Sequence, residues 1–233
     1  KIDIKPSYIQ NLDLRYEFFG ESAQMIALSG FYKFFKDPIE MTYFESAPTN
    51  LTPKNLGEAS VYGIELEVRK NFGFISKKLE NIELNVNGSL IESALKFSEI
   101  EYNLRFAGLR EGETLGNTRP LQGQSPFLVN IGLNYGNSLK GLQFGLFYNV
   151  QGKTLQVVGT GFYPDVYTMP FHSLNFNLNK TLGKERRSTI NFRINNLLDD
   201  EKESRFQSYL ASDQFFTLRK PGRLISIGYN YKF

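Results

Sequence analysis

Apolar and polar residues alternate one for one along nine segments of this chain. The clearest segment is residues 222–233, whose apolar positions are Ile225, Ile227, Tyr229, Tyr231 and Phe233. The intervening positions are mostly polar. A period of two over this length predicts a β-strand with one apolar face and one polar face. The same alternation predicts strands over residues 8–18, 24–35, 59–70, 81–92, 126–136, 141–152, 171–182 and 187–198.

Charged residues distinguish the two faces of the predicted strands. Charges at apolar positions fall near strand ends, as at Lys70 and Lys180, whereas Arg15, Glu67 and Arg193 lie at polar positions. A Lys or Arg side chain at the middle of a bilayer costs about 2–4 kcal/mol, and less near the interface. The placement favours an apolar face against lipid and a polar face against a wet lumen. A soluble β-sandwich would also keep charge off one face.

The connections between the predicted strands alternate in length, and this favours a membrane barrel over a sandwich. The short ones are residues 19–23, 71–80, 137–140 and 183–186. The long ones are residues 36–58, 93–125, 153–170 and 199–221. Outer-membrane barrels join their strands by short periplasmic turns and long extracellular loops. We therefore predict an all-β fold, a transmembrane antiparallel up-and-down β-barrel, with the long connections as extracellular loops.

The strand count predicts that this barrel is incomplete. Single-chain bacterial barrels use even numbers of strands, and an open sheet leaves two unpaired edges. We expect residues 1–233 to be a single partial domain, the carboxyl-terminal part of a larger barrel. No run of about 18 or more apolar residues occurs, so no transmembrane helix is expected.

Composition adds little to this fold but narrows the chemistry. The 21 Phe and 13 Tyr suit the aromatic girdles of a membrane barrel, and the absence of Cys excludes disulfides and thiolate metal sites. The net charge of +3 is small, and no basic stripe suggests nucleic acid as a partner. The only histidine, His172, has no catalytic neighbour on its face of the strand. We expect neither an enzyme nor a cofactor or metal site.

The candidate ligand-binding residues lie on the polar faces and in the long connections. On the predicted lumen wall, Asn175, Asn177 and Asn191 carry amides that suit sugars or peptides, or simply water or a plug. In the long connections, arginines suit anionic groups and aromatic rings suit stacking, although solvation explains the arginines at least as well and loop packing explains the rings better. These loop candidates are Arg105, Arg110, Arg119, Tyr163, Tyr167 and Tyr209.

Several short segments, in the same order along the chain, resemble those of TonB-dependent outer-membrane receptors. Residues 2–7 (IDIKPS) resemble a segment that leads into a late barrel strand, and residues 61–67 (VYGIELE) resemble a strand motif. Residues 119–126 (RPLQGQSP) resemble a segment of Bacteroidota members. Near the end, residues 195–199 (NNLLD) and 221–223 (PGR) resemble the segments around the last strands.

The resemblance implies a barrel of about 22 strands whose lumen holds a plug domain. The plug and the segment that contacts TonB would lie upstream, and both are absent from this chain. The implied function is active import of a scarce, bulky nutrient, a chelate, oligosaccharide or peptide, energised through TonB. The implied partners are outer-membrane lipid and the TonB system, and a surface lipoprotein or larger membrane complex stays open. A structural barrel subunit and a passive porin are the alternatives.

Overall fold

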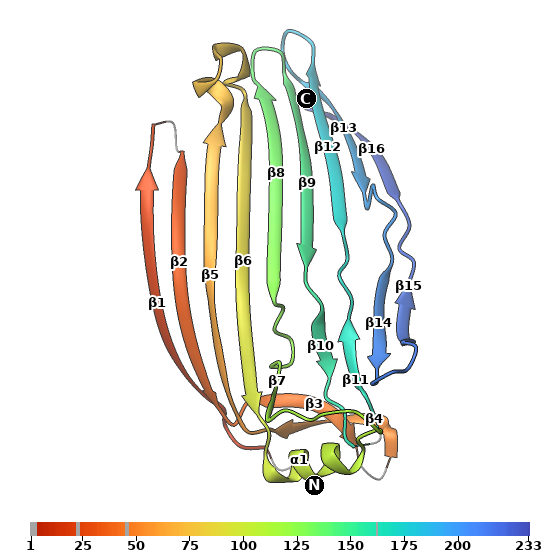
Figure 1. Ribbon diagram of the computed structural model, residues 1–233. Coiled ribbons are helices and arrows are strands. Elements are labelled where there is room, and N and C mark those ends of the chain that lie inside the picture. The colour runs from red at the N-terminus through yellow and green to blue at the C-terminus, as the bar shows by residue number, and fades with distance from the viewer. Residues whose placement is uncertain (1–3, 22–23, 45–46, 162) are drawn as a thin grey trace.

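The computed structural model shows one long, curved antiparallel sheet (Figure 1). It describes residues 4–21, 24–44, 47–161 and 163–233. Nine long strands follow one another across the sheet in chain order. They are β1 (Tyr8–Phe19), β2 (Met25–Lys36), β5 (Glu58–Asn71), β6 (Ile82–Lys96), β8 (Phe127–Asn137), β9 (Leu142–Gln151), β12 (Ser173–Leu182), β13 (Ser188–Asn195) and β16 (Leu224–Tyr231). The predicted antiparallel, all-β class is confirmed.

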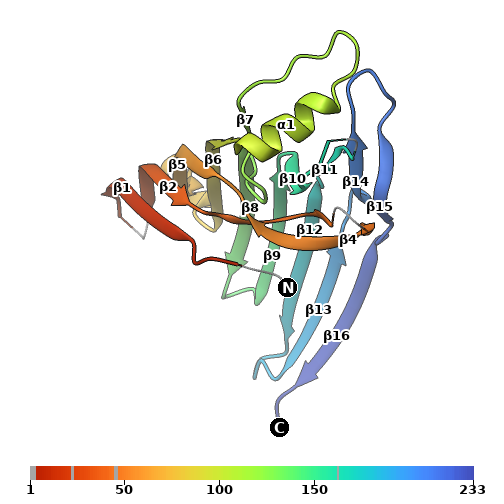
Figure 2. The same cartoon turned by 90° about the horizontal axis from the view of Figure 1, so that it is seen from below.

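The strand registers join the apolar positions into continuous rows, which we call the apolar face. One row runs through Leu84, Leu133, Leu146, Phe176, Ile194 and Ile225. Large side chains on this face stay exposed, since Leu14 is 79% and Ile227 is 76% accessible. A β-sandwich would bury such a face against a second sheet. The exposed rows and the curvature of the sheet (Figure 2) instead match the lipid-facing wall of a barrel.

The opposite side of the sheet, the polar face, carries the charges and amides. One of its rows places Asn87, Asn130 and Asn149 side by side on β6, β8 and β9. The amide of Asn130 donates to Asn87 (3.4 Å). On β1, the Arg15 guanidinium lies 2.7 Å from the Glu67 carboxylate of β5. Polar side chains on this face therefore pair with one another or face water, as the wall of a water-filled lumen requires.

All four long connections, predicted as loops, contain helices or strands, so that prediction is wrong for these segments. A hairpin of β3 (Ile39–Phe44) and β4 (Ala47–Asn55) forms between β2 and β5, and α1 (Glu99–Ala107) and β7 (Thr118–Arg119) form between β6 and β8. A separate four-stranded sheet continues the wall, with the order β10 (Thr154–Val157), β11 (Asp165–Thr168), β14 (Lys202–Gln207) and β15 (Gln214–Arg219). These strands are short and lack regular alternation, so pairing with neighbours decides their structure.

One short connection also differs from a plain turn. Residues 71–80 contain the 3-10 helices η1 (Phe72–Phe74) and η2 (Lys77–Leu79). Among the described residues, no helix combines the length and apolarity needed to cross a membrane.

The β3–β4 hairpin crosses one side of the sheet at the end that carries the long connections, which we call the long-loop end (Figures 1 and 2). Tyr43 of β3 is buried against Val157 and Val166, with Phe206 and Phe216 packed beside them. A parallel bridge between Thr42 and Val158 ties the hairpin to the segment after β10. This small apolar cluster anchors a hairpin that would otherwise bury little surface.

We predict that a charge on the apolar face disrupts membrane insertion while a charge on the polar face is tolerated. Leu146→Arg places a cation mid-strand against lipid and should cost about 2–4 kcal/mol, with most of the folded outer-membrane protein lost. The control is Asn149→Arg, three residues away on the polar face of the same strand. Heat-modifiable migration on gels measures the folded fraction, and equal folded yields for both variants would contradict the assignment of the faces.

Candidate functional site

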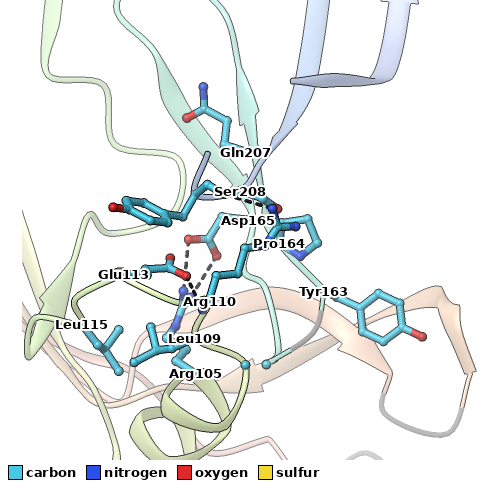
Figure 3. Close-up of a pocket in the computed structure, with 13 residues that line it drawn as sticks. Arg105, Leu109, Arg110, Glu113, Leu115, Tyr163, Pro164, Asp165, Gln207 and Ser208 are labelled. Carbon is cyan, nitrogen blue, oxygen red and sulfur yellow. Dashed lines mark hydrogen bonds and ion pairs between the residues drawn. The ribbon is translucent and has the colours of Figure 1, made fainter. Parts of the chain in front are cut away.

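Three long connections meet at the long-loop end and enclose a cavity of about 420 Å³, which we call the rim pocket (Figure 3). Its walls come from α1 and the segment after it, from the β10–β11 turn and from the β14–β15 hairpin. The lining residues are Arg105, Gly108, Leu109, Arg110, Glu113, Leu115, Gly161, Tyr163, Pro164, Asp165, Gln207, Ser208 and Tyr209.

The rim pocket lies across the sheet from the β3–β4 hairpin. Asp165 and Gln207 are register partners on β11 and β14, and both line the pocket. Their neighbours Val166 and Phe206 pack toward Tyr43 of the hairpin. Since adjacent residues of a strand point to opposite faces, the pocket and the hairpin occupy opposite sides of this sheet.

Helix α1 is positioned by its cap and by a close glycine contact. The Glu101 backbone N–H donates to the Ser98 hydroxyl (3.1 Å), which caps the helix, and Glu99 and Glu101 lie in its first turn. At the other end, a Cβ on Gly108 would lie 2.7 Å from the carbonyl oxygen of Gly161. Glycine at position 108 therefore lets the β10–β11 turn approach the end of α1.

A buried chain of alternating charges contributes Arg105 and Asp165 to the wall of the rim pocket. Arg119 contacts Glu40 of β3 (2.5 Å) and Glu101 of α1 (2.7 Å). Arg105 contacts Glu101 (3.0 Å) and Asp165 of β11 (2.9 Å). The Arg119 side chain is only 4% exposed. We call this set of five residues the charge chain, and it joins three long connections into one unit.

The charge chain holds its arginines in the charged form. Burial acts to lower the pKa of Arg119, but its hydrogen bonds to Glu40 and Glu101 outweigh that effect and raise the pKa. The pKa of Arg105 is raised in the same way, because Asp165 and Glu101 outweigh its desolvation. Both guanidinium groups are thus permanently charged and already engaged by carboxylates.

Two tyrosines beside the charge chain, the buried Tyr43 and the half-buried Tyr167, stay neutral. Burial, with a smaller contribution from the charge of Asp165, raises the pKa of both Tyr43 and Tyr167 to about 12. The rings of Tyr43 and the pocket-lining Tyr163 contact each other in a tilted arrangement, with their centres 5.5 Å apart, and Lys153 lies 4.6 Å from the ring centre of Tyr167. Neutral phenols favour ring stacking and hydrogen bonding over acid–base chemistry.

Arg110 lines the rim pocket and, unlike Arg105, is not paired with a carboxylate by its side chain. Its guanidinium donates one hydrogen bond, to the Tyr209 carbonyl (3.0 Å), and its backbone N–H donates to Glu113 (3.0 Å). Within the described part of the chain, Arg110 makes no ion pair. Its remaining donors suit a carboxylate or another oxyanion, and nearby rings suit stacking. The described residues contain no cluster of His, Asp and Glu arranged to hold a metal ion.

The structure brings together four of the predicted candidates and separates the others. Arg105, Arg110, Tyr163 and Tyr209 all line the rim pocket. Arg119 lies buried behind the pocket and Tyr167 lies on β11 beside the charge chain. The amide candidates Asn175, Asn177 and Asn191 lie on β12 and β13, outside the pocket. Whether any of these residues binds a ligand stays a prediction.

Sequence reasoning missed the acidic members of the charge chain. Ser98 and Glu101 have the spacing of a capping box, and Glu101 and Arg105 have the four-residue spacing of a helical ion pair. This signal predicts a helix where we predicted a loop. No comparable local signal marks Glu40 or Asp165, because their partners lie far away in sequence.

A family model described as "TonB dependent receptor-like, beta-barrel" matches residues 2–197. No curated protein matches the chain significantly. Among solved structures, the ferric yersiniabactin uptake receptor FyuA from Yersinia pestis aligns over 97% of this chain and 30% of its own, with 18% identity and a TM-score of 0.63. The copper transporter OprC aligns over 99% and 33%, with 16% identity and a TM-score of 0.66.

A third structure, the siderophore receptor PiuA from Acinetobacter baumannii, covers 99% of this chain and 29% of its own, with 16% identity and a TM-score of 0.62. The chain thus spans about a third of the length of these proteins. At such identities the likeness concerns the fold, and it confirms the predicted partial outer-membrane β-barrel.

We predict that the charge chain is required for order at the long-loop end. Arg119→Met leaves Glu40 and Glu101 buried without their shared cation and should cost about 3–5 kcal/mol locally. Limited proteolysis should then cut within residues 97–118 at least about a hundredfold faster, since every 1.4 kcal/mol changes the population of the open form tenfold. The matched control is Arg187→Met, which removes an exposed ion pair with Glu185. Equal cleavage of both variants would contradict this role.

Proposed function

Because this chain belongs to the family of TonB-dependent receptor-like β-barrels of the outer membrane, we propose that its full-length protein actively imports a scarce, bulky nutrient. The nutrient class is a chelate, an oligosaccharide or a peptide. Import would be energised through TonB, by way of parts of the protein outside this chain.

The match of the family model over residues 2–197 is the observation that carries this proposal. The solved relatives are named as an uptake receptor for ferric yersiniabactin, a copper transporter and a siderophore receptor. These names support transport as the function of the fold. They differ in cargo, so they do not select a cargo for this chain.

The geometry supports noncovalent capture at the long-loop end, which we take as extracellular. The rim pocket has a size within the range of small-molecule sites, and it offers Arg110, Tyr163 and Tyr209 around a wall that the charge chain holds in place. The pocket lies on the side of the wall away from the β3–β4 hairpin and the lumen, so hydrogen bonding and stacking there can capture a ligand only before it enters the lumen. No covalent step is proposed. Outer-membrane lipid would contact the apolar face.

The first test is whether loss of this protein and loss of TonB give the same phenotype. We expect deletion of the gene to abolish growth on one limiting nutrient from a panel of iron chelates, oligosaccharides and peptides. Deletion of TonB should abolish the same growth, since active import needs its energy. Uptake that persists without TonB would indicate a passive porin, and normal uptake without this protein would indicate a structural role.

The second test concerns the rim pocket, once that panel has identified a nutrient. Arg110→Gln removes the uncommitted guanidinium and should weaken binding of an anionic nutrient by about tenfold, the effect of one charge-assisted hydrogen bond. Binding to purified full-length protein measures the change. Arg223→Gln, whose guanidinium donates to the Leu197 carbonyl away from the pocket, is the matched control. Unchanged affinity in Arg110→Gln would place ligand binding elsewhere.

A further inference from the structure

A second recess lies on the opposite side of the wall from the rim pocket, next to the β3–β4 hairpin. Its volume is about 450 Å³. Lys202 and Arg219 line it together with hydroxyl and amide side chains, among them Gln151, Thr168, Ser204 and Thr217. We call it the cationic recess.

Strand parity places the cationic recess on the polar face. Lys202 and Ser204 alternate with Glu203 and share a side of β14 with Phe206, which packs toward Tyr43 of the hairpin. Asn149 and Gln151, which line the same recess, belong to the polar rows of β9. Since the polar face bounds the lumen, the recess opens inside the proposed barrel, on the same side of the wall as the hairpin.

The two cations of the recess oppose each other directly. Lys202 and Arg219 are register partners on the antiparallel strands β14 and β15. Like charges directly opposite each other on such strands destabilise the pair. Both side chains are exposed to solvent, and a neighbouring negative charge would relieve their repulsion.

The part of the chain that the structure describes supplies no such charge. The Lys202 ammonium lies 4.6 Å from the centre of the Phe171 ring, and neither Lys202 nor Arg219 makes an ion pair with a described residue. The one carboxylate in the lining, Glu203, is 2.9 Å from Arg205. By contrast, each arginine of the charge chain is shared between two carboxylates.

The neutral lining suits a polar ligand rather than an apolar one. Ser204 and Thr217 share a hydrogen bond of 2.6 Å, and the Thr168 hydroxyl donates to Gln156 (3.1 Å). Asn149 also lines a neighbouring recess of about 440 Å³ together with Asn87 and Asn130, so the polar lining continues along the lumen wall.

We propose that the cationic recess binds a carboxylate group of the imported ligand through Lys202 and Arg219. Two cations on adjacent strands can contact both oxygens of one carboxylate, or two carboxylates of one small molecule. This inference rests on the proposed import function, because that function is what makes the bound anion part of the imported nutrient. The binding site itself is testable without transport.

The test uses the full-length protein, purified in detergent, and titrates it calorimetrically with succinate at constant ionic strength. Succinamide, which has the same skeleton without charge, is the comparison ligand. We expect saturable binding of succinate at least about tenfold tighter than that of succinamide, because charge-assisted hydrogen bonds exceed neutral ones.

Variants assign that binding to the recess. The double variant Lys202→Gln, Arg219→Gln should lose at least about tenfold in succinate affinity. Lys202→Glu should also lose it, because the new carboxylate would pair with Arg219 in register, and its melting temperature should rise. The control variant Arg187→Gln, Lys220→Gln removes two cations that are paired with Glu185 and Glu201, and it should bind like the natural protein.

Each outcome decides the proposal. Absence of saturable binding, equal binding of succinamide, or unchanged affinity in the double variant would overturn it. If an acidic side chain from another part of the full-length protein fills the recess, succinate will not bind, and that result also overturns the proposal. Succinate binding that depends on the pair, in a protein whose loss leaves nutrient uptake intact, would keep the site and reject import instead.

Discussion

The pairing of backbone N–H and C=O groups across the sheet is the constraint on which this structure depends. Hydrocarbon offers these groups no partners, so a membrane-spanning strand must find them on its neighbours. The registers from β1 to β16 meet that demand strand by strand, and they also align the side chains into one apolar and one polar face. Exposure of Leu14 and Ile227 on the apolar face is then no defect, because lipid is the medium that face contacts.

A different interaction organises the long-loop end, where water replaces lipid. There the chain folds back on itself through the charge chain and the apolar cluster around Tyr43. Buried ion pairs stabilise little relative to apolar packing but are costly to break, so they favour one arrangement of the connections over others. The two arginines of the charge chain are neutralised by carboxylates within the wall, whereas Arg110, Lys202 and Arg219 make no ion pair with a described residue.

The long strands could be predicted from sequence because a period of two over eight or more residues leaves little ambiguity. The largest difference is β6, which runs on to Lys96. The strands β10, β11, β14 and β15 could not be predicted, because four to six residues without alternation depend on tertiary pairing. Arg105 and Arg110 could be singled out by residue type, but their partners Asp165 and Tyr209 are distant in sequence. Membership of the Bacteroidota stays a prediction from residues 119–126.

The two walls of the rim pocket are anchored very differently. On one side, carboxylates form several short ion pairs with Arg105. On the other side, Arg110 donates one side-chain hydrogen bond to the β14–β15 hairpin, which is itself held by the pairing of β14 with β11. Substitution of Arg110 would therefore leave the ion pairs of Arg105 intact. Under the proposed function, this asymmetry would let the residues around Arg110 change with the cargo while the ion pairs of Arg105 keep the other wall in place.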